Sequence, residues 1–197
     1  AWACWNWELI KDSENLHYQT NWTPSNDVVI VTPYYAIAPD GSFNAVKFNR
    51  GSTDQGRYLR QIVTKATENK VYTTSVYFKK SDARYASIRL QGNYPARADC
   101  VVDLDNGSIT STTSTGNFSN HTSEISAEDN GWYRVSLSAT SDTFNQIQVV
   151  YSCSAEAHVI DNTSSVVNSV LIWGAQLEES DAANTYVQST DTFTSRL

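Results

Sequence analysis

The sequence predicts an all-β protein folded as a two-sheet antiparallel jelly-roll β-sandwich. Three observations predict this class: many short segments alternate apolar and polar residues with a period of two, Thr and aromatic residues are abundant, and turn residues separate the segments. No long segment is rich in the helix formers Ala, Glu, Lys and Leu. We therefore expect negligible helix and a double-sheet sandwich whose strands are joined by turns and long returns.

The alternation also locates the individual strands. Pro39-Asp40-Gly41 and Asp105-Asn106-Gly107 are turns, because Gly supplies the positive φ that such turns need. Residues 106–130 are polar and low in complexity, and we interpret them as a hairpin plus a mobile loop. The predicted strands are 8–11, 28–32, 44–50, 57–65, 70–80, 84–91, 99–105, 108–113, 132–140, 145–154 and 165–178.

The last third of the chain gives the clearest local signals. Asn130-Gly131 predicts a turn, and residues 133–138 alternate apolar with polar side chains, as expected of a strand with one buried face. Residues 170–178 are almost continuously apolar around Gly174, which predicts a central strand buried on both faces.

A series of short motifs covers nearly the whole chain. They are LIKDSENL at 9–16, NWT at 21–23, APDG at 38–41, AVKF at 45–48, Gln61, YTTSVYFK at 72–79, DLDNG at 103–107, GWYRVS at 131–136 and IWGAQLE at 172–178. In this order they resemble the carbohydrate-binding-module-like jelly-roll domains of bacteriophage fibre, spike and other virion proteins. Relatives also occur as appended modules of secreted bacterial polysaccharide enzymes. The residues before Leu9 have no counterpart in that pattern.

Composition excludes two classes of partner. The 197 residues suit one domain, and the formal net charge of −7 argues against nucleic-acid binding, which needs a basic face. No run of about 18 apolar residues is present, so we expect no membrane insertion.

Catalysis, metals and cofactors are not expected. No nucleophile elbow, zinc-protease motif or phosphate loop is present, and nothing in the sequence pairs the acidic residues as a glycosidase would require. Jelly rolls of the resembled family often hold Ca²⁺ between the N-terminal and last strands, where Asp12 or Glu14 could supply one ligand. In this chain Trp173-Gly174 stand where those relatives have acidic residues. We therefore predict no enzyme, no cofactor and no metal site.

Alternation predicts a candidate ligand face. If the strands at 70–80, 84–91 and 145–154 neighbour one another in one sheet, its outer face carries an aromatic ring, amides and cations. Such groups recognise sugars, because rings pack on pyranose C–H faces while amide and guanidinium groups bond vicinal hydroxyls. The alternative is an ordinary solvated face. The candidate glycan-binding residues are Tyr77, Lys79, Arg89, Gln91 and Gln148.

The chain start differs from the rest. We divide the chain into a Trp-rich segment, 1–7, and a jelly-roll domain, 8–197. Trp2, Trp5 and Trp7 would be costly in water, so they either fold back on the sandwich or contact another subunit, and we expect the subunit contact. The three cysteines contain no C-x-x-C pair, and we expect reduced thiols.

The sequence thus favours a non-catalytic bacteriophage virion-surface protein, a fibre, spike or capsid decoration, that binds surface glycans. Its expected partners are other virion proteins or copies of itself, in an oligomeric assembly made in the host bacterial cytoplasm. Two alternatives remain: a purely structural assembly or cement protein, and a carbohydrate-binding module of a secreted bacterial enzyme.

Overall fold

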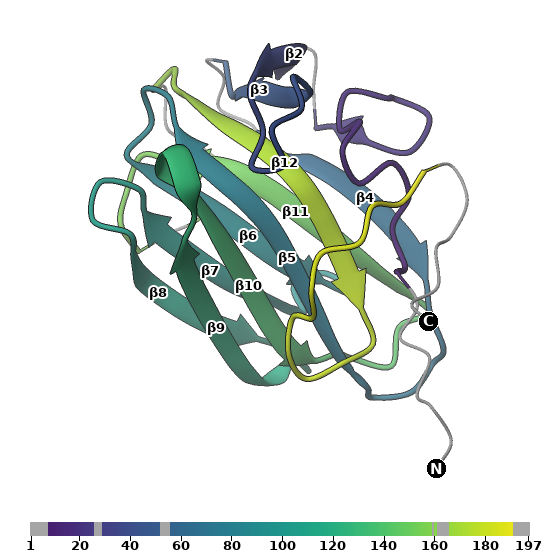
Figure 1. Ribbon diagram of the computed structural model, residues 1–197. Helices are drawn as coiled ribbons and strands as arrows, with labels where there is room; N and C mark the ends of the chain where they lie inside the picture. Colours follow the sequence, from purple (N-terminus) through teal and green to yellow (C-terminus); the bar gives the residue numbers. More distant parts are fainter. Residues whose placement is uncertain (1–7, 26–28, 52–55, 159, 161–165, 191–197) are drawn as a thin grey trace.

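The computed structural model describes residues 8–25, 29–51, 56–158, 160 and 166–190. These residues form two six-stranded sheets with antiparallel pairing throughout (Figure 1). The back sheet has the order β1 (Thr23–Pro24), β4 (Leu59–Thr64), β11 (Gln146–Ser154), β6 (Tyr85–Gln91), β7 (Arg97–Asp103) and β8 (Ser108–Thr115). The front sheet has the order β2 (Ile30–Ala36), β3 (Ala45–Asn49), β12 (Ser169–Glu178), β5 (Val71–Lys80), β10 (Trp132–Thr140) and β9 (Ser119–Ala127). The expected all-β, two-sheet jelly-roll class is confirmed.

The core lies between the two sheets and follows the predicted alternation. Ala86, Ile88 and Leu90 of β6 have no exposed surface, and they belong to one apolar cluster with Val76 and Phe78 of β5. From β11 the cluster takes every second side chain, Ile147, Val149, Tyr151 and Cys153. Burial of these apolar surfaces is the main driving force that holds the sheets together. The intervening side chains point toward the outer faces of the sheets.

Two local predictions are wrong. Residues 106–130 do not contain a long loop but two strands, β8 and β9, and the chain crosses from the back to the front sheet at 116–118. The polar, low-complexity sequence gives no sign of β9, because β9 is an edge strand. Its strand conformation is fixed by backbone pairing with β10 and not by an apolar face of its own. Residues 8–11 form no strand, although the Leu9 amide donates to the Leu177 carbonyl at 2.9 Å.

Helix is almost absent from the described ranges. They contain one 3-10 turn, η1 (Asp129–Gly131), and no helix that is long and apolar enough to cross a membrane. Cys100 and Cys153 are free and buried, and burial raises the pKa of the Cys100 thiol to about 11. Cys4 and the predicted subunit contacts Trp2, Trp5 and Trp7 lie outside the described residues, so the expected role of segment 1–7 remains a prediction.

Candidate functional site

The five predicted glycan-binding residues do not share a face. Tyr77 and Lys79 lie on β5 in the front sheet, whereas Arg89, Gln91 and Gln148 lie on β6 and β11 in the back sheet. The prediction required β5, β6 and β11 to be neighbours in one sheet. They are not, because the chain changes sheets between β5 and β6. Alternation along one strand says which residues share a side, but it does not say which strands are neighbours.

The back sheet brings its three predicted residues together. Gln148 and Gln91 are register partners on the adjacent strands β11 and β6. The Gln148 Oε1 accepts a hydrogen bond of 3.3 Å from Arg60 Nη1 of β4, and Arg60 makes no ion pair with any residue that the structure describes. The strands thus present planar amides next to a guanidinium, which can bond vicinal hydroxyls in pairs.

A charge cluster continues this surface toward β7. Arg89 forms a two-pronged ion pair with Asp99, from Nε at 2.6 Å and from Nη2 at 3.0 Å. Arg97 donates to the same carboxylate from Nε at 3.2 Å. Only 6% of Arg89 is exposed, so it is neutralised and held in place rather than presented to solvent. Arg89 therefore fixes the position of Asp99, and Arg97 becomes the more accessible cation.

A cavity of about 220 Å³ lies over this cluster on the outer face of the back sheet. Its lining combines an aromatic ring, charged groups and hydroxyls: Arg89, Tyr94, Arg97, Asp99, Val101, Ser111, Thr113, His158 and Ile160. Tyr94 is 69% exposed, and the Arg97 guanidinium lies 5.5 Å from its ring centroid. An exposed ring beside fixed donors and acceptors is the combination that sugar recognition uses.

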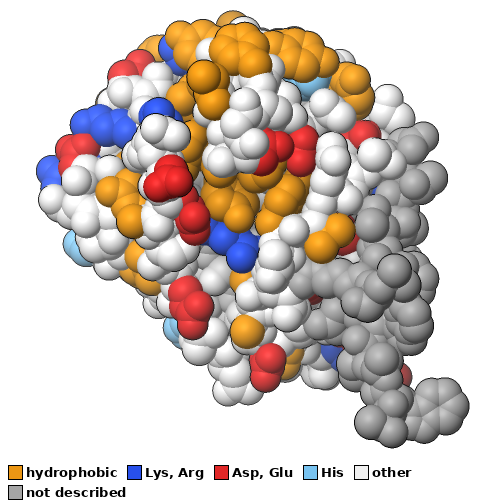
Figure 2. Space-filling model, viewed as in Figure 1, with side chains coloured by type: hydrophobic (Ala, Val, Ile, Leu, Met, Phe, Trp, Pro, Cys, Tyr) orange, Lys and Arg blue, Asp and Glu red, His pale blue; other side chains and the backbone are white. Residues whose placement is uncertain are grey.

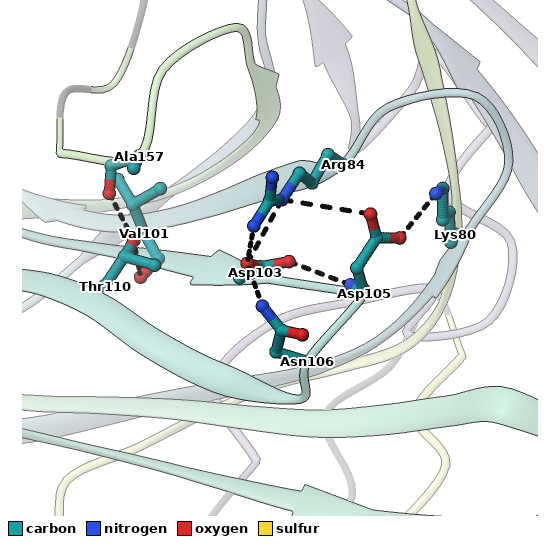
Figure 3. A network of polar contacts seen from close by, with 8 residues as sticks. All are labelled: Lys80, Arg84, Val101, Asp103, Asp105, Asn106, Thr110 and Ala157. Atoms are coloured by element: carbon teal, nitrogen blue, oxygen red, sulfur yellow. Dashed lines mark hydrogen bonds and ion pairs between the residues drawn. The ribbon is translucent and has the colours of Figure 1, made fainter.

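The loop that borders the cavity is attached to β8. Thr110 Oγ1 bonds the carbonyl oxygens of both Val101 and Ala157, and Figure 3 shows this residue joining the strand to the loop. His158 Nδ1 donates to the Thr110 carbonyl at 3.0 Å. Both contacts fix the described part of this loop beside the cavity, which limits the entropy cost of binding there.

A second polar network supports the β7–β8 hairpin. Asp103 accepts hydrogen bonds from Arg84 Nη2 at 2.7 Å, from Asn106 Nδ2 at 2.7 Å and from the Asp105 amide at 2.9 Å (Figure 3). The Arg84 hydrogen bond is the main reason that the pKa of Asp103 falls from 3.8 to about 2. This network fixes the far end of the strand that carries Asp99.

The outer face of the front sheet is aromatic but largely covered. Trp132 and Trp173 are 1% and 3% exposed, and they pack in a small apolar cluster with half-buried Tyr77. Figure 1 shows the segment after β12 turning back across this face. It contributes Tyr186, whose ring centroid lies 4.8 Å from that of Trp173 and 5.9 Å from that of Tyr77. The two tryptophans are therefore structural, although they lie outside the space between the sheets.

Gly174 makes this packing possible. It sits at a register shift in the β12–β5 pairing, with φ of +61°, a conformation that favours Gly. A Cβ at this position would lie 2.9 Å from Tyr77 Cδ2 and 3.4 Å from Tyr186 Cε2. The extra residue also keeps Trp173 on the outer face and Ala175 in the core.

The acidic residues near β12 are bonded to protein donors. Glu14 accepts from Asn44 Nδ2 at 2.8 Å and from the Tyr186 hydroxyl at 3.1 Å, and burial raises its pKa. Asp12 accepts from Asn21 Nδ2 at 2.6 Å. Among the described residues no group of three or more His, Cys, Asp or Glu side chains could hold a metal ion.

Reasoning from the sequence missed several residues of the back-sheet cavity, above all Tyr94, Arg97 and Asp99. Tyr94 lies in a loop, where no periodicity predicts its orientation. Arg97 and Asp99 do alternate along β7, but only the pairing of β7 with β6 shows that they adjoin Arg89.

Comparisons with known proteins identify the fold. No protein-family model matches this chain, and no curated protein matches its sequence. The enzymatically active domain of tailspike protein 4 from bacteriophage CBA120 aligns over 86% of this chain with 13% identity and a TM-score of 0.50. This chain covers 21% of that tailspike chain.

Carbohydrate-binding modules align less closely. The CBM22-1–GH10 modules of xylanase 10B from Clostridium thermocellum, solved with xylohexaose, align over 93% of this chain and 30% of that chain, with 8% identity and a TM-score of 0.48. The module TmCBM27, studied for mannan recognition, aligns over 90% of this chain and 99% of that chain, with 11% identity and a TM-score of 0.44. The alignment with the tailspike domain shows a shared fold alone, and any ligand has to be argued from the side chains of this chain.

Proposed function

We propose that this protein is a non-catalytic glycan-binding module of a bacteriophage virion surface, and that it binds glycans on the outer face of its back sheet. The observation that carries the proposal is the cavity of about 220 Å³, which adjoins Gln91 and Gln148 through Arg89. The cavity is open, polar and lined by one highly exposed ring.

The roles follow from the contacts. Tyr94 supplies the surface on which the apolar face of a pyranose packs, because its ring is exposed and lies beside Arg97. Arg97, Gln91 and Gln148 bond the hydroxyls, and Arg89 and Asp99 hold this array in register. Arg60 and Arg97 favour glycans that carry a carboxylate, and their partial exposure makes this preference sensitive to salt.

Affinity per site should be weak, in the high-micromolar to millimolar range, since the surface is shallow and has one aromatic anchor. Display of many copies on a particle would raise the avidity without any new contact. The weak single site thus suits an assembled surface protein.

The test is a broad glycan array followed by titration of each hit. Tyr94→Ala should abolish the binding of neutral and acidic glycans alike at the back sheet, whereas Arg97→Gln should mainly weaken the acidic ones. Tyr35→Ala is the matched control, because Tyr35 is 47% exposed on the front sheet and should leave binding unchanged. Absence of any hit would favour the purely structural alternative, and hits that are indifferent to both Tyr94 and Arg97 would overturn the back-sheet site.

The virion role rests on the sequence resemblance and on the fold shared with a tailspike domain. We expect the protein in purified particles, where mass spectrometry would detect it. Deleting residues 1–7, or changing Trp2, Trp5 and Trp7 to Ser, should weaken self-association while the sandwich stays folded, and sedimentation would measure this. A protein absent from particles but fused to a secreted catalytic domain would instead be a carbohydrate-binding module of a bacterial enzyme.

A further inference from the structure

A hollow of about 110 Å³ lies on the front sheet, on the opposite side of the sandwich from the proposed glycan surface. It lies over β9 and β10, whose outward side chains face one another in the pairs Ser126–Arg134 and Glu124–Ser136. Ala183 of the segment after β12 closes one side. Figure 2 views this sheet from outside and shows hydrophobic side chains recessed at the centre of the face, with basic and acidic groups beside them.

Arg134 is incompletely satisfied at this hollow. Its Nη2 donates to Ser75 Oγ at 3.1 Å and to the Asn184 carbonyl at 2.5 Å, which are both neutral acceptors. The Nε is buried without a hydrogen-bond partner, and Arg134 forms no ion pair within the described ranges. A partly buried guanidinium in this state favours an additional oxygen acceptor.

The remaining lining defines which acceptor fits. Glu124 is exposed and offers an anionic acceptor, so a ligand carboxylate would be repelled while an N–H donor would be attracted. Ala183 offers apolar contact at the side of the hollow, whereas Ile125 reaches the hollow only through its backbone, because its side chain packs against the core between the sheets. The volume is half that of the back-sheet cavity, which suits a substituent better than a whole sugar ring.

An acetamido group combines these three properties, because it has a carbonyl acceptor, an N–H donor and a methyl group on one plane. The half-buried Tyr77 ring lies beside Arg134, whose guanidinium carbon is 5.7 Å from its centroid, and so helps to hold the guanidinium in place.

We propose that this hollow is a second binding site, which takes the acetamido group of an N-acetylated amino sugar. Arg134 donates to the acetamido carbonyl, Glu124 accepts from its N–H, and Ala183 contacts its methyl group. The site is separate from the proposed glycan surface, because the two lie on different sheets and share no residue.

The test is an NMR titration of ¹⁵N-labelled protein with N-acetylglucosamine, glucose and glucuronic acid. The chemical shifts of the backbone amides and of the arginine Nε–H groups report binding. We expect millimolar binding of N-acetylglucosamine, about tenfold weaker binding of glucose, and shifts at Ser126, Arg134 and Ser136. Equal affinity for glucose or glucuronic acid, or shifts that leave these residues unmoved, would overturn the proposal.

Three variants keep the test independent of folding and of the back-sheet site. Glu124→Gln changes an exposed side chain and should weaken N-acetylglucosamine binding several-fold, while Asp129→Asn, an exposed acid outside the lining, should not. Arg97→Gln on the back sheet should leave this binding unchanged. Indifference to Glu124→Gln, or loss of binding in Arg97→Gln, would contradict the assignment to the front sheet.

Discussion

The outer faces of the two sheets carry the same kinds of side chain in opposite arrangements. On the back sheet an exposed Tyr94 stands beside arginines that a carboxylate holds in place. On the front sheet Trp173 is almost fully buried beneath a segment that returns after β12, and Trp132 is buried with its indole Nε1 donating to the Ile37 carbonyl. The comparison teaches that an aromatic residue on an outer face is a candidate ligand contact only if nothing in the chain covers it.

The two faces also differ in how they are held together. Ring contacts among Tyr77, Trp173 and Tyr186 fasten the covering segment to the front sheet, and the Tyr186 hydroxyl bonds Ser13 at 2.7 Å. Charged pairs such as Arg89–Asp99 and Arg84–Asp103 organise the back sheet. Apolar packing contains no titrating group, whereas the charged pairs need ionised carboxylates, so the two faces should respond differently to pH.

The largest expected effect breaks the front face. Trp173→Ala removes a buried ring, and the cavity left behind should cost about 3–5 kcal/mol of unfolding free energy. Tyr94→Ala is the matched change on the back face, where an exposed ring should cost less than about 0.5 kcal/mol. Urea denaturation of both variants measures the difference. Equal losses would show that the two faces do not differ in the way described.

A smaller effect sharpens the role of the register shift in β12. Gly174→Ala should lower the unfolding free energy by about 2–4 kcal/mol. The added Cβ is unfavourable in the left-handed backbone conformation, and it also lies too close to Tyr77. Gly41→Ala is the control, since Gly41 has φ of +87° but no atom within 4 Å of an added Cβ. We expect it to cost only the backbone term, roughly 1–2 kcal/mol. If the Gly41 variant were as unstable as the Gly174 variant, the close contact with Tyr77 would not be the cause of the extra destabilisation at Gly174.

The smallest effect concerns pH on the back sheet. The pKa of Asp103 is lowered from 3.8 to about 2, so its carboxylate stabilises the folded state. This contribution to the unfolding free energy is complete above pH 3.8 and is lost as the pH falls through about 2. Asp103→Asn should cost roughly 1–2 kcal/mol at neutral pH, a modest amount since Arg84 is half-exposed and screened by solvent. The difference between wild type and variant should shrink steadily between pH 4 and pH 2 in denaturation curves. A difference that stays constant over this range would mean that the Asp103 carboxylate does not supply it.

Much of the fold could be predicted because it depends on local pattern. The strands β5, β6, β10 and β11 lie close to their predicted ranges, since each alternates core and surface residues with a period of two. The edge strand β9 could not be predicted in the same way, because neither of its faces is strongly apolar. Its position is decided by hydrogen bonds to β10 that no local signal encodes.

The sequence by itself determined the class of the fold and the direction in which most side chains of each strand point, because alternation and turn residues act over a few neighbours. Tertiary structure alone decided which strands are adjacent, and so it separated Tyr77 and Lys79 from Arg89, Gln91 and Gln148. It also decided that the segment after β12 covers Trp173 while Tyr94 stays exposed. These outcomes depend on contacts between residues far apart in the chain, whose free energy is gained only when both sheets are assembled.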